Sequence, residues 1–406
     1  MLIMVTVFCL LAGTLLSIYQ RGHTQARYVR EIEAINPGSV RFYYDYQTRM
    51  DPTQRQLFSS RPSFLGRMLG KDFVHRIERV EFSPLATDAQ IKKCAQISGL
   101  KEVQLNGAVW PSRWESILDY PTLEHLHISC FSPVNARQKI SLTDLNRFNR
   151  LRVLIVDGFE LTEDNWNKIL SLPRLKHLEL FSTDSSVADF SRLPTSDSVE
   201  KFSWRPGSMV SQATLSGLIQ HLPGLKTLSV WGGIQPMPMI PHAGQPGIDS
   251  SDTSSSDTTG EPILTPIDDQ IFLSLRNCPR LENLSLFRTR VSGVNIEMLQ
   301  SLPLKWIELP SSQLNDQGLA KLAKFPHLRQ LEIGSTAVSD QGMKALSAAP
   351  KLVSLSIRDT QVTDEGMAAL ATLESLEKIR IRDTLITPDA IQEFLKINPD
   401  CKIDQQ

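Results

Sequence analysis

The sequence has few cysteines, and they form no recognisable pairing pattern. Five cysteines are scattered over 406 residues, and no two of them are spaced as C-x-x-C. An odd and dispersed set of this kind indicates neither a disulfide framework nor a zinc site. Since an unpaired thiol behaves as a small apolar group, we expect buried free cysteines.

The chain also lacks an excess of charge of either sign. It carries 43 Lys and Arg residues against 44 Asp and Glu residues, which gives a formal net charge of −1 at pH 7. Proteins that bind nucleic acid usually present a basic domain to the phosphate backbone. We therefore expect no nucleic-acid partner.

Motifs of known enzyme classes are missing as well. The sequence contains no glycine-rich phosphate loop, no H-E-x-x-H, no G-x-S-x-G and no kinase signature set. The aspartates that follow Ser or Thr recur from repeat to repeat, which indicates a structural role. We therefore predict that the chain is not an enzyme and has no catalytic, cofactor-binding or metal-binding residues.

What the sequence does contain is a repeat of about 24 residues. Leu352–Ser375 and the stretches that begin at Leu328 and Leu376 share the pattern L-x-x-L-x-[LI]-x-x-T-x-V-[ST]-D-x-G-[LM]-x-x-L. Self-similarity at a period of about 20–30 residues is typical of a solenoid, and this spacing of leucines is that of leucine-rich repeats.

The residues of one repeat predict its local structure. Leu355 and Ile357 are two apart, so they share the inward face of a short strand. The hydroxyl of Thr360 can satisfy backbone groups of the following turn. Thr363 is a candidate N-cap of a helix of about three turns, on which Met367 and Leu370 face the strand.

Twelve such repeats are predicted, with residues 401–403 as a closing strand. One repeat is much longer than the others because residues 235–266 are inserted, and this segment is rich in Pro, Gly, Ser and Asp. Such a composition predicts a disordered loop. The repeats begin at Ile77, Leu100, Leu123, Leu151, Leu175, Val199, Leu225, Leu281, Leu304, Leu328, Leu352 and Leu376.

The N-terminus carries the longest apolar run, Leu2–Tyr19, which has 18 uncharged residues. This length is near the lower limit for a membrane-spanning helix, so residues 1–20 are predicted to be a retained transmembrane anchor. A cleaved signal peptide is the alternative, but no basic residue precedes the run and no cleavage site follows it. Arg21, Arg27 and Arg30 come after the run, so the positive-inside rule favours a single-pass membrane protein with a cytoplasmic body. An upstream start with arginines would reverse that orientation.

The fold class that follows is α/β, a right-handed leucine-rich-repeat solenoid with a parallel sheet on its concave side and helices on its convex side. Residues 21–73 are predicted to form a juxtamembrane helix and an N-terminal cap, since a solenoid must cover its first repeat. Residues 74–406 are the predicted repeat domain.

Two N-terminal segments support a closer resemblance. Ile32, Ala34, Ile35, Gly38, Val40, Tyr44 and Asp45 match an "IEALGG-x-V-x-YD" segment, and Phe64, Leu65, Arg67, Leu69, Gly70, Asp72 and Phe73 match a "P-x-WLRR-LLGDDFF" segment. In these features the chain resembles the membrane-anchored leucine-rich-repeat proteins of planctomycete bacteria, with ribonuclease-inhibitor-like repeats. Asn36-Pro37 and the insertion depart from that pattern. The resemblance implies a repeat scaffold and no catalytic residues.

The outward positions of the strands supply the candidate binding residues. Large aromatic side chains and arginines are expected to lie together in a stripe, and such residues dominate the binding energy of protein interfaces. Cover by the insertion or a shift in register remains the alternative. The predicted partner-binding residues are His177, Phe181, Arg205, Trp231, Phe287, Trp306, Arg358 and Arg382.

Two further outward clusters are weaker candidates. Arg358, Lys378, Arg380 and Arg382 form a basic patch that is expected to be a solvated face, because Asp359 and Asp383 stand beside it. His125-x-His127 places two imidazoles on one face about 7 Å apart. Metal binding there is conceivable, but a polar lining is favoured.

We therefore predict a non-enzymatic scaffold that binds a protein or peptide on its concave face at a membrane, as a monomer. The alternatives are a hydrolase-like or metal-dependent activity on concave His, Asp and Glu residues, and a structural protein of the cell envelope without a specific ligand.

Overall fold

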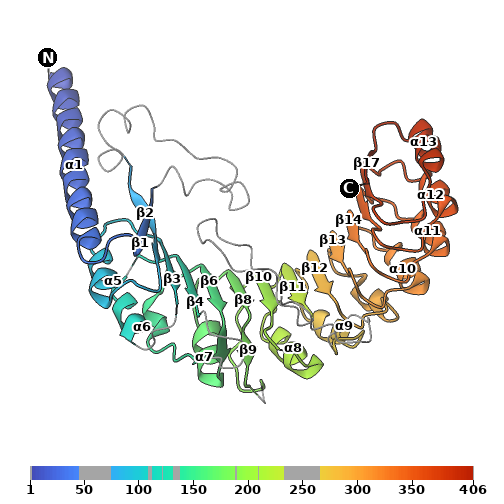
Figure 1. Cartoon of the computed structure of the whole chain (residues 1–406), viewed down its shortest axis with the longest axis horizontal. Helices are drawn as coiled ribbons and strands as arrows, with labels where there is room; N and C mark the ends of the chain where they lie inside the picture. The colour runs from blue at the N-terminus through green and yellow to red at the C-terminus, as the bar shows by residue number, and fades with distance from the viewer. Residues whose placement is uncertain are drawn as a thin grey trace, which may run out of the picture. The chain divides into compact units, whose positions relative to one another are not determined.

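The computed structural model describes residues 2–44, 75–107, 112–120, 122–130, 138–187, 190–208, 210–232 and 266–405. The chain divides into two compact units, Met1–Val187 and Ala188–Gln406 (Figure 1). Both units are built from strand–turn–helix repeats, with a parallel sheet of short strands. The α/β solenoid-like fold that the repeat predicted is therefore present. The predicted disordered insertion and most of the segment between β1 and β2 lie outside the described residues.

The first unit begins with helix α1 (Leu2–Glu33) and strand β1 (Val40–Tyr44), which pairs antiparallel with the first repeat strand, β2 (Ile77–Phe82). Strands β3 (Glu102–Asn106), β4 (His125–Ser129), β6 (Val153–Asp157) and β8 (His177–Phe181) follow in parallel. Helices α5 (Asp88–Cys94), α6 (Ser112–Ile117) and α7 (Glu163–Leu170) and the 3₁₀ turn η1 (Leu145–Arg147) connect them.

The first unit also contains a second small sheet, which the sequence did not predict. Its strands are β5 (Gln138–Lys139), β7 (Phe159–Leu161) and β9 (Asp184–Ser185), paired in parallel. Trp166 of α7 is buried beside this sheet and donates from its indole Nε1 to Ser185 Oγ at 3.0 Å. These extra strands belong to the repeats that start at Leu123, Leu151 and Leu175.

Among the residues whose placement is described, no helix combines the length and the apolar character that crossing a membrane requires. The anchor expected over residues 1–20 stays a prediction. The apolar run is the first part of a 32-residue helix, and the second part of that helix packs on the repeats. Gln25 is buried, donates to the carbonyl of His75 at 2.9 Å and accepts from the amide of Ile77 at 3.1 Å. The helix and β1 thus cover the first repeat strand, as a terminal cap must.

The second unit carries strands β10 (Lys201–Arg205), β11 (Thr227–Trp231), β12 (Asn283–Phe287), β13 (Trp306–Glu308), β14 (Gln330–Glu332), β15 (Ser354–Ser356), β16 (Lys378–Arg380) and β17 (Lys402–Asp404). All neighbours in this series pair in parallel. β11 pairs directly with β12, so the inserted segment leaves the sheet unbroken.

Helices α8 (Gln212–Ile219), α9 (Ile271–Leu275), α10 (Asp316–Leu322), α11 (Asp340–Leu346), α12 (Asp364–Leu370) and α13 (Pro388–Ile397), with the 3₁₀ turn η2 (Ile296–Leu299), lie on the other side of this sheet (Figure 1). The consensus helices are shorter than the three turns expected. α12 has 7 residues, which is about two turns. Leucines of both the strands and the helices are buried.

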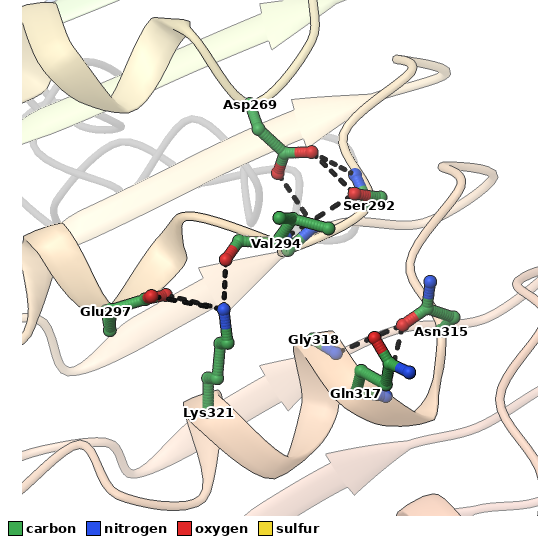
Figure 2. Close-up of polar contacts among 9 residues, drawn as sticks. Asp269, Ser292, Val294, Glu297, Asn315, Gln317, Gly318 and Lys321 are labelled. Atoms are coloured by element: carbon green, nitrogen blue, oxygen red, sulfur yellow. Dashed lines mark hydrogen bonds and ion pairs between the residues drawn. The ribbon is translucent and has the colours of Figure 1, made fainter.

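Aspartates link successive repeats. Asp340 of α11 accepts from the amide of Thr363 at 2.8 Å and from its hydroxyl at 2.7 Å, and Thr363 in turn caps α12. Asp269 holds Ser292 in the same way, as Figure 2 shows. The predicted N-cap is thus present, and these carboxylates are occupied by backbone and hydroxyl donors, in keeping with their predicted structural role.

One repeat lacks this aspartate link to its neighbour. Gly293 stands where the consensus has Asp, and Asn315 caps α10 through its own side chain, which accepts from the amides of Gln317 and Gly318 (Figure 2). The neighbouring turn is tied instead by Lys321, whose Nζ contacts the carbonyl of Val294 and the carboxylate of Glu297.

Four cysteines in the described part of the chain, Cys94, Cys130, Cys278 and Cys401, are free and buried, as predicted. Burial raises the pKa of the Cys278 thiol to about 12, so this thiol stays protonated at neutral pH. These side chains are part of the core.

Candidate binding groove

The strands of the second unit present three rows of outward side chains. Because the strands pair in register, equivalent residues of successive repeats stand side by side. The middle row reads Ser229, Ser285, Glu308, Glu332, Ser356, Arg380 and Asp404. Ser285, Glu308 and Glu332 of this row form the base of the candidate site, and residues of the row nearer the strand ends form its walls.

Aromatic rings form one wall of the site. Trp231 and Phe287 end the neighbouring strands β11 and β12, and their ring centroids are 5.0 Å apart. The guanidinium carbon of Arg205 lies 4.0 Å from the centroid of the Trp231 ring, within the range of a cation–π contact. Trp231 still exposes 38% of its surface. The wall is therefore ordered by its own contacts and remains accessible.

A turn with a left-handed residue follows each outer strand. Ser311, Ser335, Asp359 and Asp383 all have φ between 52° and 56°. The amides of Ser311, Ser335 and Asp359 continue the hydrogen bonding between repeats; Ser335, for example, donates to the carbonyl of Arg358 at 2.7 Å. The strained turns are thus held by neighbouring repeats, and they form the rim of the site.

Arginines form the opposite wall, and they are paired with acidic groups of the same face. Arg358 donates to Glu332 at 2.8 Å, and Arg380 reaches the other oxygen of Glu332 at 3.6 Å. Arg382 contacts Asp383 at 3.1 Å. The basic patch is therefore partly neutralised by Glu332, which the sequence did not indicate, and by Asp383, which it did.

Glu308 differs from Glu332 although the two carboxylates are on adjacent strands. In the described part of the chain no Lys, Arg or His forms an ion pair with Glu308. Burial raises the pKa of the Glu308 carboxyl, and the charge of Glu332 raises it further. Hydrogen bonding with Ser285 and Trp306 and the charge of Arg380 lower this pKa, but they do not reverse the shift.

Together these side chains enclose a groove of about 500 Å³. Pro310 and Gly334 have small side chains or none, so the space between the aromatic and the arginine walls stays open. A volume of this size suits a few side chains of a partner. The groove is lined by Trp231, Ser285, Phe287, Glu308, Pro310, Ser311, Glu332, Gly334, Ser335, Arg358, Asp359, Arg382 and Asp383.

The groove collects only part of the predicted stripe. Trp231, Phe287, Arg358 and Arg382 line it. Arg205 contributes through its contact with Trp231, and Trp306, which exposes 42% of its surface, stands beside Glu308 on β13. His177 and Phe181 lie on β8 of the other unit and are half-buried there.

Sequence reasoning missed Glu332 at the base of the groove and the serines of its rim. Glu332 escaped notice because an outward Glu on a strand is common, and only the structure shows that two arginines converge on it. The rim residues stand directly after the outward position, at a constant place in each repeat. That recurrence of Ser and Asp was the available signal, since Asp tolerates the left-handed region better than most residues do.

The outward face of the first unit is polar and tightly paired. Arg79 contacts Glu102 at 3.2 Å, donates to Gln104 at 2.6 Å and lies 4.7 Å from the centre of the Tyr43 ring. Burial lowers the pKa of His127, and the charge of Arg79 lowers it further. In the described ranges His125 and His127 belong to no group of three metal-ligating side chains.

Comparison with known proteins identifies the repeats. The family model described as Leucine Rich repeat matches residues 326–347 and 348–371. No curated protein matches the chain.

Among solved structures, an internalin from Listeria monocytogenes is 15% identical, with a TM-score of 0.49 over 84% of this chain and 93% of that chain. A leucine-rich-repeat protein from Leptospira interrogans is also 15% identical, with a TM-score of 0.36 over 86% of this chain and 93% of that chain. At these values the two structures carry no argument about the ligand.

Proposed function

We propose that this leucine-rich-repeat protein is a non-enzymatic scaffold, and that it binds a protein or peptide in the groove of strands β11 to β16. The match of residues 326–371 to the repeat family supports this, because repeats of this kind build extended surfaces for protein binding. The finer prediction of a partner at a membrane stays a prediction.

The observation that carries the proposal is the exposed aromatic wall. Trp231 stacks on Phe287 and under Arg205, yet it leaves 38% of its surface to solvent beside a groove. Rings that are ordered in the free protein lose little conformational freedom on binding. Exposed and ordered Trp and Arg side chains are the residues that most often carry the binding energy of an interface.

A capture experiment tests the proposal. The full chain, the Trp231→Ala variant and the Leu273→Ala variant are immobilised separately, and proteins retained from an extract of the producing cells are quantified by mass spectrometry. Leu273 is a suitable control because it is a large apolar residue, 54% exposed, on helix α9 and away from the groove.

We expect at least one protein that the wild-type chain and Leu273→Ala retain equally and that Trp231→Ala retains at least about tenfold less, as for a hot-spot residue. Retention of the same proteins by all three chains would contradict a role for the groove.

A further inference from the structure

We propose that the groove recognises an extended peptide segment that carries a lysine or arginine beside an apolar side chain. The cation would lie at Glu308, and the apolar side chain would lie on the wall of Trp231 and Phe287. This inference rests on the proposed function and specifies the chemistry of the partner.

The first step is the difference between two neighbouring carboxylates. Glu308 and Glu332 stand side by side on the paired strands β13 and β14. Glu332 accepts from Arg358 at 2.8 Å and is 3.6 Å from Arg380. Within the described ranges, no cationic side chain forms such a pair with Glu308. The base of the groove therefore holds one satisfied carboxylate and one that a cation from outside could pair.

The second step is the state of Glu308 in the free protein. Glu308 is half-buried, with Ser285 and Trp306 hydrogen-bonded to its carboxyl, and both this burial and the charge of Glu332 raise its pKa. The ionised form of a carboxyl in this place is destabilised, because its charge is partly desolvated and lies beside a like charge. A cation that enters the groove would offset this destabilisation of the Glu308 carboxylate, so binding of a cation is favoured there.

The third step concerns the kind of cation. A divalent metal ion prefers several oxygen ligands, and the oxygens of Glu332 are already engaged by arginines. Within the described residues no group of three metal-ligating side chains occurs. The aromatic rings beside Glu308 suit an organic cation, because the stem of Lys or Arg packs on apolar surface while its charge reaches the carboxylate.

The fourth step is the spacing of the two subsites. Glu308 is paired in register with Ser285, and Phe287 lies two residues further along β12. The two positions are therefore separated by one strand spacing of about 4.8 Å and by about 6.6 Å along the strand, or about 8 Å in all. Because an extended peptide advances about 3.3 Å per residue, the apolar and basic side chains of the ligand are expected two or three positions apart.

Selection from a library of random 12-residue peptides, displayed on phage, tests the inference. The library is panned on the full chain, on Glu308→Gln, and on Glu297→Gln as a matched control. Glu297 is an exposed carboxylate on η2, paired with Lys321 outside the groove. Glu308→Gln keeps the size of the side chain and removes its charge, and it is not expected to impair folding.

We expect the full chain and Glu297→Gln to select peptides with Lys or Arg two or three positions from an aromatic or large aliphatic residue. The dissociation constant of such a peptide should rise at least tenfold on Glu308→Gln. Replacing the basic residue of the peptide by norleucine should cause a similar loss on the wild-type chain and no further loss on Glu308→Gln.

Several results would overturn the inference: no selected peptide, peptides without a basic residue, or equal affinity for Glu308→Gln. If the selected peptides require Trp231 but not Glu308, the inference fails while the proposed function stands. Peptides that do not require Trp231 either would count against both.

A further arm addresses the chain's own segment as the occupant. Removing residues 236–264 leaves six residues between Trp231 and Ile267, against three between Phe287 and Val291 in the next repeat. We expect the shortened chain to bind the selected peptide with unchanged affinity. Binding to the shortened chain alone would identify this segment as the occupant of the groove and would overturn the inference.

Discussion

An aspartate of the preceding repeat explains why glycine occupies its place in the D-x-G step. A Cβ atom on Gly342 would overlap with Oδ1 of Asp316, and one on Gly366 would overlap with Oδ1 of Asp340. The same aspartate oxygens accept from the amides of Ser339 and Thr363, both at 2.8 Å. The Asp and the Gly of the consensus are thus one interaction, shared between two repeats.

We therefore predict that Gly342→Ala lowers the stability of the chain by about 1–3 kcal/mol, as overpacking usually does. The new methyl group must displace the Asp316 carboxylate from its donors. Denaturant unfolding measures the change. Gln341→Ala, at the exposed neighbouring position, should change stability by less than about 0.5 kcal/mol. Equal effects of the two substitutions would show that Asp316 does not occupy this space.

The left-handed turn residues give a second prediction at this scale. Ser335 has a φ of 56° and is exposed. Its backbone conformation is therefore strained, and its side chain is not packed in the core. Ser335→Gly should raise stability by about 0.5–1 kcal/mol, because relief of the left-handed strain exceeds the extra entropy lost by glycine. Ser335→Val should lower stability, since a β-branched side chain disfavours this region. The thermal midpoints of both variants test the sign, and a lower midpoint for Ser335→Gly contradicts the account.

Among the elements, the strands were the most predictable and the turns the least. The period-2 alternation of Leu355 and Ile357 fixed which strand residues point inward, and both are fully buried. Thr363 was identifiable as a cap because Asp and Glu follow it. By contrast, the extra sheet around β7 depends on contacts between three irregular repeats. The pairing of Glu332 with two arginines depends on how far side chains reach across strands. Neither is encoded in a local pattern.

Glu308 on strand β13 gives a prediction about how the stability of the chain depends on pH. Since the pKa of Glu308 is raised in the folded chain above its ordinary value of 4.5, its ionisation costs stability above the folded pKa. Below the unfolded pKa the carboxyl is protonated in both states, and this cost disappears. Glu308→Gln should therefore be more stable than wild type at pH 7, and the difference should shrink as pH falls through the window between the two pKa values. Thermal unfolding from pH 7 to pH 3 measures it; a difference that grows towards low pH would contradict the raised pKa.

At the scale of the whole molecule, the groove covers less of the chain than the predicted stripe of binding residues does. The sequence suggested one stripe from His177 to Arg382, because outward positions were read as a continuous series. The structure divides the chain into two units, and the groove belongs to the second alone. The face of the first unit is an internally paired polar network around Arg79. Sequence periodicity could not foresee this division, because the leucine pattern continues through both units.

At the scale of the whole molecule, the Trp231→Ala variant allows the effect on stability to be separated from the effect on binding. Trp231 contacts Phe287 and Arg205 but is partly exposed, so its removal should cost only about 1–2 kcal/mol of stability. Its loss from a binding interface should cost at least about 2 kcal/mol of binding free energy. The two effects are separable because the thermal midpoint reports the first and the affinity reports the second.

The most direct test is isothermal titration of a captured partner against the wild-type chain and Trp231→Ala, with Leu273→Ala as control. The account predicts a dissociation constant at least tenfold higher for Trp231→Ala, an unchanged value for Leu273→Ala, and cooperative unfolding of all three chains. An unchanged dissociation constant for a folded Trp231→Ala variant would contradict the central claim that this groove binds the partner.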